Sequence, residues 1–240
     1  MQRQRVNLQP AYLLHQRPYR DSSQIVELVT RDHGRIGLVA RGARRPRARL
    51  RAVLQPFQPL LVSWTARGDL GTLTACEAVT GLPALPPQHA NSGYYMNELV
   101  VRLTRRHDAH PGLFACYAAG LQGLVHSDSE ARVLRLFEKR LLDELGYGLQ
   151  LQRTAAGESV VGDGSYSYRV EQGIVTTDPV HEHGPVFAGH SLLALAAERL
   201  DDDAVLGDVR ILLQLALEQH LGPRPLQVRR VARAMRRSLQ

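Results

Sequence analysis

The sequence predicts an α+β fold with an N-terminal β-barrel, followed by an α-helical domain into which a small β subdomain is inserted. Three observations lead to this prediction. Apolar residues alternate with a period of two over the segment 1–80, whereas from Tyr94 to Leu145 they recur at helical spacing. Between these regions, the segment Pro83-Ala84-Leu85-Pro86-Pro87 can continue neither a strand nor a helix. Glycine-rich alternation then returns at 148–187.

Short strands joined by tight turns account for the segment 1–80. Asp32-His33-Gly34 and the segment 67–71 have the composition of turns between strands. This pattern favours a small closed barrel of the oligonucleotide-binding (OB) kind, and an SH3-like barrel is the competing interpretation. The strands are expected at 11–15, 24–30, 35–40, 57–65 and 72–79.

Helices are predicted after the proline-rich segment, each with a recognisable start. Asn91 or Ser92 can cap the first helix, and Pro111 opens the second, which runs through Val125. Ser129 caps a third helix that ends at Gly146.

The C-terminal part of the chain predicts one β-hairpin and three further helices. The hairpin is expected around Tyr166, Tyr168 and Ile174, and the helices at 191–200, 204–221 and about 225–238, with Ser191 capping the first. We therefore expect four parts: an OB barrel (1–80), a helical domain (81–147), a small β-hairpin subdomain (148–188), and C-terminal helices that pack on the helical domain and end in a basic tail (189–240).

Charge divides the chain into basic ends and an acidic middle. Residues 1–80 contain 13 arginines and five acids, residues 81–220 contain 11 cations and 18 acids, and residues 221–240 contain six arginines and no acid. Such segregation suggests binding surfaces rather than a general solubility charge. All cations except Lys139 are arginines, which bind phosphate oxygens bidentately, although a GC-rich genome gives the same bias.

The densest cationic segment lies between the third and fourth predicted strands. Residues 41–51 contain six arginines and no acid, and the mutual repulsion of these cations does not stabilise the fold. A phosphate backbone is the commonest partner for such a loop. The alternative is a solvated loop that only maintains solubility. The C-terminal arginines form a second patch that contacts either nucleic acid or an acidic protein. The candidate DNA-binding residues are Arg35, Arg41, Arg44, Arg45, Arg47, Arg49, Arg51, Arg224, Arg229, Arg230 and Arg233.

Catalytic and metal-binding patterns are weak. The segment around Ser191 lacks the second glycine that a nucleophile elbow requires. The segment His181-Glu182-His183 fits an exposed loop better than a metal site. Aromatic side chains that could stack on bases are sparse in the barrel, and Phe57 and Trp64 are expected to be core or half-core residues. We expect no enzyme activity, cofactor or metal. A metal-dependent nuclease using Asp201–Asp203 is the alternative.

Two further features bear on location and chemistry. No apolar stretch is long enough to span a bilayer and no signal-peptide pattern is present, so we expect no membrane association and a cytoplasmic, nucleoid-associated protein. Cys76 and Cys116 are far apart in the sequence and lack CxxC spacing, which argues against a disulfide framework or a thiolate zinc site. Both are expected to be small core residues.

Arg135 lies in the third predicted helix beside apolar residues. A cation at the rim of an apolar groove can capture a peptide that ends in a hydrophobic residue and a carboxylate. The simpler interpretation is an exposed helical arginine paired with Glu138 or Asp128.

Several segments, in order along nearly the whole chain, resemble those of the bacterial recombination-mediator family RecO. They are Leu14-His15-Gln16-Arg17-Pro18-Tyr19-Arg20, the glycine-arginine segment 34–44, Leu54-Gln55-Pro56-Phe57-Gln58-Pro59-Leu60, Tyr95-Met96-Asn97-Glu98-Leu99, Arg135-Leu136-Phe137-Glu138, Leu145-Gly146-Tyr147-Gly148 and Leu221-Gly222-Pro223-Arg224-Pro225-Leu226.

This resemblance implies a non-enzymatic protein that binds single- and double-stranded DNA and anneals complementary strands. It implies RecR as a partner, and through it the loading of RecA onto strands coated by single-stranded-DNA-binding protein (SSB). It also implies that Arg135 holds the acidic C-terminal tail of SSB, with Arg132, Leu134 and Phe137 around it. An RNA- or ribosome-associated accessory protein with the same barrel is the alternative.

One departure from the family concerns zinc. Some members have a four-cysteine zinc module in the region that matches 150–180, whereas this stretch contains no cysteine. The resemblance therefore implies a small subdomain without zinc, held by its own core around Tyr166, Tyr168 and Ile174.

Overall fold

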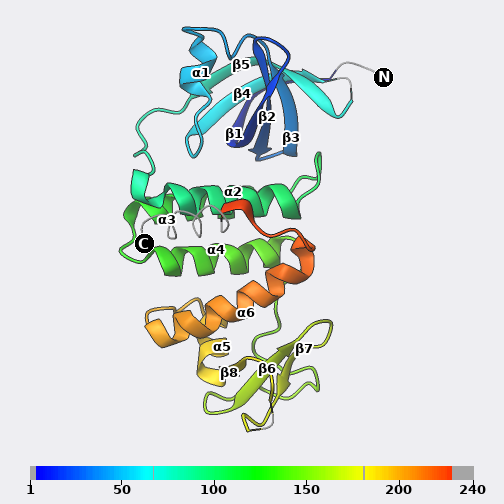
Figure 1. Cartoon of the computed structure of the whole chain (residues 1–240), viewed down its shortest axis with the longest axis vertical. Helices are drawn as coiled ribbons and strands as arrows, with labels where there is room; N and C mark the ends of the chain where they lie inside the picture. Colours follow the sequence, from blue (N-terminus) through cyan, green and yellow to red (C-terminus); the bar gives the residue numbers. More distant parts are fainter. Residues whose placement is uncertain (1–3, 67, 181, 229–240) are drawn as a thin grey trace. The chain divides into compact units, whose positions relative to one another are not determined.

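The fold is described from a computed structural model that covers residues 4–66, 68–180 and 182–228 (Figure 1). These residues form two compact units. Among the described residues, the first consists of the chain from Gln4 to His126 together with residues 225–228, and the second lies within Ser127–Arg224. Each unit combines strands with helices, so the boundary between the units differs from the boundaries expected from the sequence. The division into four parts stays a prediction.

A closed barrel fills the N-terminal part of the first unit. Within the described residues its strands are β1 (Gln4–Tyr19), β2 (Ser23–Thr30), β3 (Gly34–Ala40), β4 (Pro59–Ala66) and β5 (Leu70–Ala78). They pair in the order β1-β2-β3-β5-β4, β1 closes the barrel against β4, and only the β3–β5 pairing is parallel. A short helix, α1 (Arg49–Val53), lies between β3 and β4. The predicted OB barrel is confirmed.

β1 is much longer than the predicted strand because two irregularities interrupt its alternation. The register shifts between Val6 and Gln9 and again between Leu13 and His15. Each shift changes which side chains face inward, so the strand can pair with β4 along its first half and with β2 along its second. The barrel core is formed by residues of all five strands and by Ala43 and Leu54, with Trp64 only 3% exposed.

Two helices complete the part of the first unit described before Ser127. α2 (Ala90–Leu103) follows a 3-10 turn, η1 (Pro87–His89), and α3 (Pro111–His126) begins at the predicted proline. The capping role expected for Asn91 or Ser92 is wrong, because the 3-10 turn runs directly into α2 and its N-cap position is His89, with no side-chain cap hydrogen bond.

Two buried polar side chains, Asn97 and Tyr117, attach these helices to the barrel. The Asn97 amide on α2 donates to the carbonyl oxygens of Leu13 (3.4 Å) and Leu14 (3.0 Å) of β1. Tyr117 on α3 donates its hydroxyl to the Asn97 Oδ1 at 2.5 Å. Burial raises the pKa of Tyr117 far above its usual value, so the hydroxyl remains a donor at any physiological pH. The backbone carbonyls at the β1 irregularity are thereby satisfied.

The second unit contains three helices and a three-stranded sheet within the described residues. α4 (Glu130–Glu144) begins at Ser129, whose hydroxyl accepts from the Arg132 amide as predicted. α5 (Gly189–Ala196) and α6 (Asp203–Leu221) follow the sheet, and Asp202 caps α6. The sheet has the order β7-β6-β8, from β6 (Ser165–Arg169), β7 (Gly173–Thr176) and β8 (Val186–Ala188). The predicted hairpin is therefore joined by a strand that the sequence analysis missed.

Side chains of this small sheet form their own core. Tyr166 and Ile174 are buried as predicted, and Phe187 of β8 joins them at 1% exposure. The Tyr166 hydroxyl accepts from the Val161 amide at 2.9 Å. Tyr168, which was expected in this core, is only half-buried and donates to Gln219 of α6. Apolar contacts and these hydrogen bonds hold the sheet together without thiolate ligands.

Ser191 has a different role from the predicted one. α5 already begins at Gly189, where a side chain would collide with the Val161 carbonyl, so Ser191 lies inside the helix. Its hydroxyl donates to Asp208 of α6 at 2.7 Å and fixes the two helices to each other. The cap prediction for Ser191 is therefore wrong.

The two cysteines occupy core positions, as expected. Cys116 is buried, and Cys76 is half-buried against the barrel core. Burial, the larger cause, and the neighbouring Glu77 carboxylate raise the pKa of Cys76 to about 11, which keeps this thiol protonated at neutral pH. None of the described helices is both long enough and apolar enough to span a membrane.

Candidate nucleic-acid interface

The arginine loop, residues 41–51, connects β3 to the first turns of α1. Its backbone folds as a series of hydrogen-bonded turns: the Arg44 amide donates to the Ser22 carbonyl at 2.9 Å, and the Arg45 amide donates to the Gly42 carbonyl at 3.0 Å. Gly42 has φ 69°, which glycine adopts at little cost. Arg47, at φ 60°, adopts the same left-handed region at a cost of about 1–2 kcal/mol. The loop thus has a defined path.

Apolar residues anchor both ends of this loop. Ala43 and Leu54 are each 1% exposed within the barrel core, and Leu50 and Val53 of α1 pack against it. All six arginines of the loop are exposed. Anchoring of this kind presents the cations on a fixed surface.

The arginines of the loop have no carboxylate partner among the described residues, whereas several arginines elsewhere in the chain do. Within the described residues, none of the six loop arginines forms an ion pair, and Arg44 instead donates to the Arg20 carbonyl at 3.2 Å. Exposed pairs contribute little to stability, but they do neutralise charge. The described ion pairs of arginines outside the loop join Arg31 to Asp32, Arg35 and Arg106 to Glu27, Arg102 to Glu98, Arg132 to Asp201, Arg135 to Glu138, Arg140 to Glu198 and Arg169 to Glu182.

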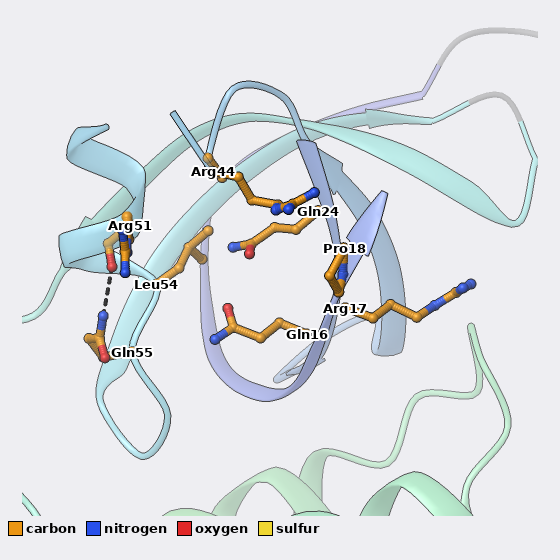
Figure 2. Close-up of a pocket in the computed structure, with 9 residues that line it drawn as sticks. Gln16, Arg17, Pro18, Gln24, Arg44, Arg51, Leu54 and Gln55 are labelled. Carbon is orange, nitrogen blue, oxygen red and sulfur yellow. Dashed lines mark hydrogen bonds between the residues drawn. The ribbon is translucent and has the colours of Figure 1, made fainter. Parts of the chain in front are cut away.

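One side of the loop borders a cleft of about 620 Å³, which we call the α1 cleft. Figure 2 shows Gln16 and Gln24 projecting into the space between α1 and the ends of β1 and β2, with Arg44 lying across Gln24 and with Arg51 of α1 beside Gln55, which follows the helix. No acid is among the described residues that line it. They are Gln16, Arg17, Pro18, Gln24, Ala43, Arg44, Arg51, Leu54 and Gln55.

The other side of the loop borders a second cleft, of about 660 Å³, which we call the β5 cleft because Thr72 of that strand forms one wall. The Tyr19 ring at its edge is covered by the Arg20 guanidinium, 5.1 Å from the ring centroid. The described lining again lacks an acid and consists of Tyr19, Arg20, Ser22, Ser23, Val39, Arg41, Gly42, Arg45 and Thr72. Both clefts are therefore cationic hollows suited to anions.

Arg35 does not belong with these arginines. Its guanidinium donates to Glu27 (2.9 Å), to the Thr104 hydroxyl (3.1 Å) and to the Thr104 carbonyl (2.9 Å). Arg106 also pairs with Glu27, and this hydrogen bond raises the pKa of Arg106. With its donors committed to this network, Arg35 holds β3 to the end of α2, and we leave it out of the interface.

The C-terminal patch is only partly described. Arg224 is exposed at the end of the second unit, whereas Arg229, Arg230 and Arg233 lie outside the described residues. The segment leading to them is fixed on α2, because the Glu98 carboxylate accepts from the amides of Gln227 (2.7 Å) and Val228 (3.0 Å). A contact between these arginines and DNA stays a prediction.

Few aromatic rings are placed to stack on bases. Trp64 is in the barrel core, with its ring edge-to-face with His33, and Phe57 packs edge-to-face against Tyr94 at 4.9 Å. The partly buried Tyr19, at the β5 cleft, already has a cation over its ring. The described part of this region therefore offers cationic side chains rather than aromatic surfaces for stacking.

A separate candidate site lies on α4, in the second unit. Arg135 is only 8% exposed, and its Nη2 donates to Glu138 at 2.5 Å, so the predicted pairing is present but the residue is not on the surface. Its buried Nε has no acceptor among the described residues. Arg132 pairs with the exposed Asp201 at 2.9 Å, Leu134 is half-buried, and Phe137 is 2% exposed. Phe137 is thus a core residue.

Two of the three acids suggested for a nuclease have structural partners, and the third, Asp203, lies in the first turn of α6. Asp202 accepts from the Ala204 amide at the start of α6, and Asp201 pairs with Arg132. Across the described residues no group of three or more histidine, cysteine, aspartate or glutamate side chains is placed to hold a metal ion, and His181 lies outside them.

Comparison with known proteins identifies the family. Residues 4–82 match the family model described as the N-terminal domain of recombination protein O, and residues 91–230 match the model of its C-terminal domain. The chain belongs to the RecO family. The boundary between the two models falls in the proline-rich segment that was expected to separate barrel and helices.

Members of the RecO family match this chain over nearly its full length. A DNA repair protein RecO from Nitrosococcus oceani is 45% identical over 97% of this chain and 95% of its own length. Those from Ralstonia nicotianae and Azoarcus sp. are 44% and 43% identical, each over 95% of this chain and over 84% and 96% of their own lengths. Family membership places the chain among DNA repair and recombination proteins, for which an OB barrel with an unpaired cationic loop is a suitable DNA-binding module.

Two interface arginines were missed as binding residues in the sequence analysis. Arg17 and Arg20 lie well before the loop in the sequence, and only the barrel topology brings the β1–β2 turn beside it. The two arginines flank Pro18-Tyr19 at a turn between two strands. This position could have indicated that they are exposed, because cations at the end of a strand frequently remain in contact with solvent.

Proposed function

We propose that this RecO-family protein is a recombination mediator that binds single- and double-stranded DNA through the arginine loop and anneals complementary strands. The observation that supports this most is the anchored loop of six exposed arginines without carboxylate partners. Two strands repel each other through their phosphates, and cations fixed between them lower that repulsion so that bases can meet and pair. Because few aromatic platforms are present, the bases remain available for pairing.

We further propose that α4 docks the protein on strands coated by SSB, through the acidic C-terminal tail of SSB. The Arg135 guanidinium, 8% exposed and paired with Glu138, places a cation just beneath the surface of α4, where it would attract an incoming carboxylate. Arg132 would exchange the exposed Asp201 for an acid of the tail, which costs little because exposed pairs contribute about 0–1 kcal/mol. Phe137 serves as support in the core, and Leu134 is the apolar residue left for contact. RecR, and RecA through it, are the further partners that we propose.

Annealing of complementary oligonucleotides, bare or coated with SSB, tests both proposals in one experiment. We expect the intact chain to accelerate annealing of both substrates. The double variant Arg135→Met/Glu138→Gln removes both charges of the buried pair together, which preserves packing better than removing one partner. It should retain acceleration on bare strands and lose at least tenfold on coated strands.

The controls separate the two claims. Arg140→Gln, on the same helix, leaves the Arg135 pair in place and should behave like the intact chain on both substrates. If the intact chain fails to accelerate annealing of bare strands, the mediator function is contradicted. If the double variant equals the intact chain on coated strands, the tail binds elsewhere.

A further inference from the structure

The two cationic clefts share the arginine loop but have no lining residue in common. In the β1–β2 pairing, Tyr19 lies opposite Ser23 and Pro18 opposite Gln24. The pair Tyr19 and Ser23 lines the β5 cleft, whereas the neighbouring pair Pro18 and Gln24 lines the α1 cleft.

The arginine loop continues this separation. Arg41, Gly42 and Arg45 line the β5 cleft, and Ala43, Arg44 and Arg51 line the α1 cleft. Each cleft thereby receives two loop arginines and one from β1 or the β1–β2 turn, and the two described linings have no residue in common. The clefts also have similar volumes, about 620 and 660 Å³, so neither is a minor extension of the other.

We propose that the barrel binds two DNA strands at once, one backbone in each cleft, with the arginine loop between them. This inference rests on the proposed annealing function and specifies how one protein chain carries it out. Phosphates would enter the clefts while the bases point outward, since Tyr19 is the only aromatic residue among the described linings and its ring is covered by Arg20. The two strands are thereby held on either side of the arginine loop, with its cations between their phosphates and with their base edges accessible for pairing.

Binding stoichiometry tests this inference, with an oligothymidylate of about six nucleotides, which is short enough to occupy a single cleft. Native mass spectrometry or calorimetry at low salt should give two oligonucleotides per intact chain. Arg44→Ala/Arg51→Ala, in the α1 cleft, and Arg41→Ala/Arg45→Ala, in the β5 cleft, should each bind one. Annealing by either double variant should fall at least tenfold, although each still binds one strand.

A matched control comes from the same loop. Arg47→Ala/Arg49→Ala removes the same charge, but these arginines line neither cleft, so its stoichiometry should remain two even where its affinity is lower. A stoichiometry of one for the intact chain, or of two for both cleft variants, overturns the two-strand inference and leaves DNA binding itself standing. No binding by the intact chain would overturn the proposed function as well.

Discussion

Replacing Arg44, Arg45, Arg47 and Arg49 together with alanine is expected to lower single-stranded DNA affinity by about 10²–10³-fold at about 0.1 M salt. Each phosphate contact on a single strand contributes a slope of about −0.7 in log affinity against log salt, so at about 0.1 M each lost contact removes about 0.7 log units. Four contacts then remove about 2.8 units. Strand annealing should fall in parallel, and fluorescence anisotropy of a labelled oligonucleotide measures the affinity.

This variant should fold normally, because its side chains form no ion pair within the described structure. Exposed substitutions of this kind change stability by about 0.5 kcal/mol or less. A control with Arg153, Arg169, Arg199 and Arg210 changed to alanine removes the same charge from exposed positions of the second unit. Its DNA affinity should stay close to that of the intact chain. Equal losses in the two variants would mean that net charge, rather than the loop, is responsible.

The largest expected effect on stability comes from Glu27→Ala. The Glu27 side chain is 10% exposed and is the shared acceptor of Arg35 and Arg106, so its removal leaves two guanidinium groups partly buried without their carboxylate. Breaking a buried ion pair by deleting one partner costs about 3–5 kcal/mol. That is a large part of the roughly 5–15 kcal/mol by which domains are typically stable. Urea unfolding should show a correspondingly lower midpoint.

Asp32→Ala provides the comparison for Glu27. Asp32 pairs with Arg31, but both side chains are about half exposed, and such pairs contribute about 0–1 kcal/mol. If Glu27→Ala were no more destabilising than Asp32→Ala, Arg35 would be available for DNA after all, and its exclusion from the interface would be wrong.

Local signals in the sequence predicted the elements that local physics determines. Alternation placed strands in the barrel, and Ser129 and Pro111 marked helix starts, because caps and first-turn prolines act within a short stretch of the chain. Ser191 and Asn91 show the limit of the same rule. A cap-forming side chain is only available for that role where the helix begins, and tertiary contacts at Gly189 and the 3-10 turn at Pro87–His89 moved both starts.

Long-range pairing explains what the sequence analysis missed. β8 is too short to show alternation, and it is a strand only because it pairs with β6. Arg35 was grouped with the loop arginines because its partner Thr104 is 69 residues away. The division of the arginines between two clefts likewise depends on barrel register, which the spacing of cations along the chain does not reveal.

The salt dependence of single-stranded DNA binding by the intact chain tests the central claim most directly. If the loop arginines contact phosphates, six contacts predict a slope of roughly −4 in log affinity against log salt. Fluorescence anisotropy across a salt series measures this slope. A slope close to zero, or no binding in dilute buffer, would contradict the claim that these unpaired arginines bind a nucleic-acid backbone.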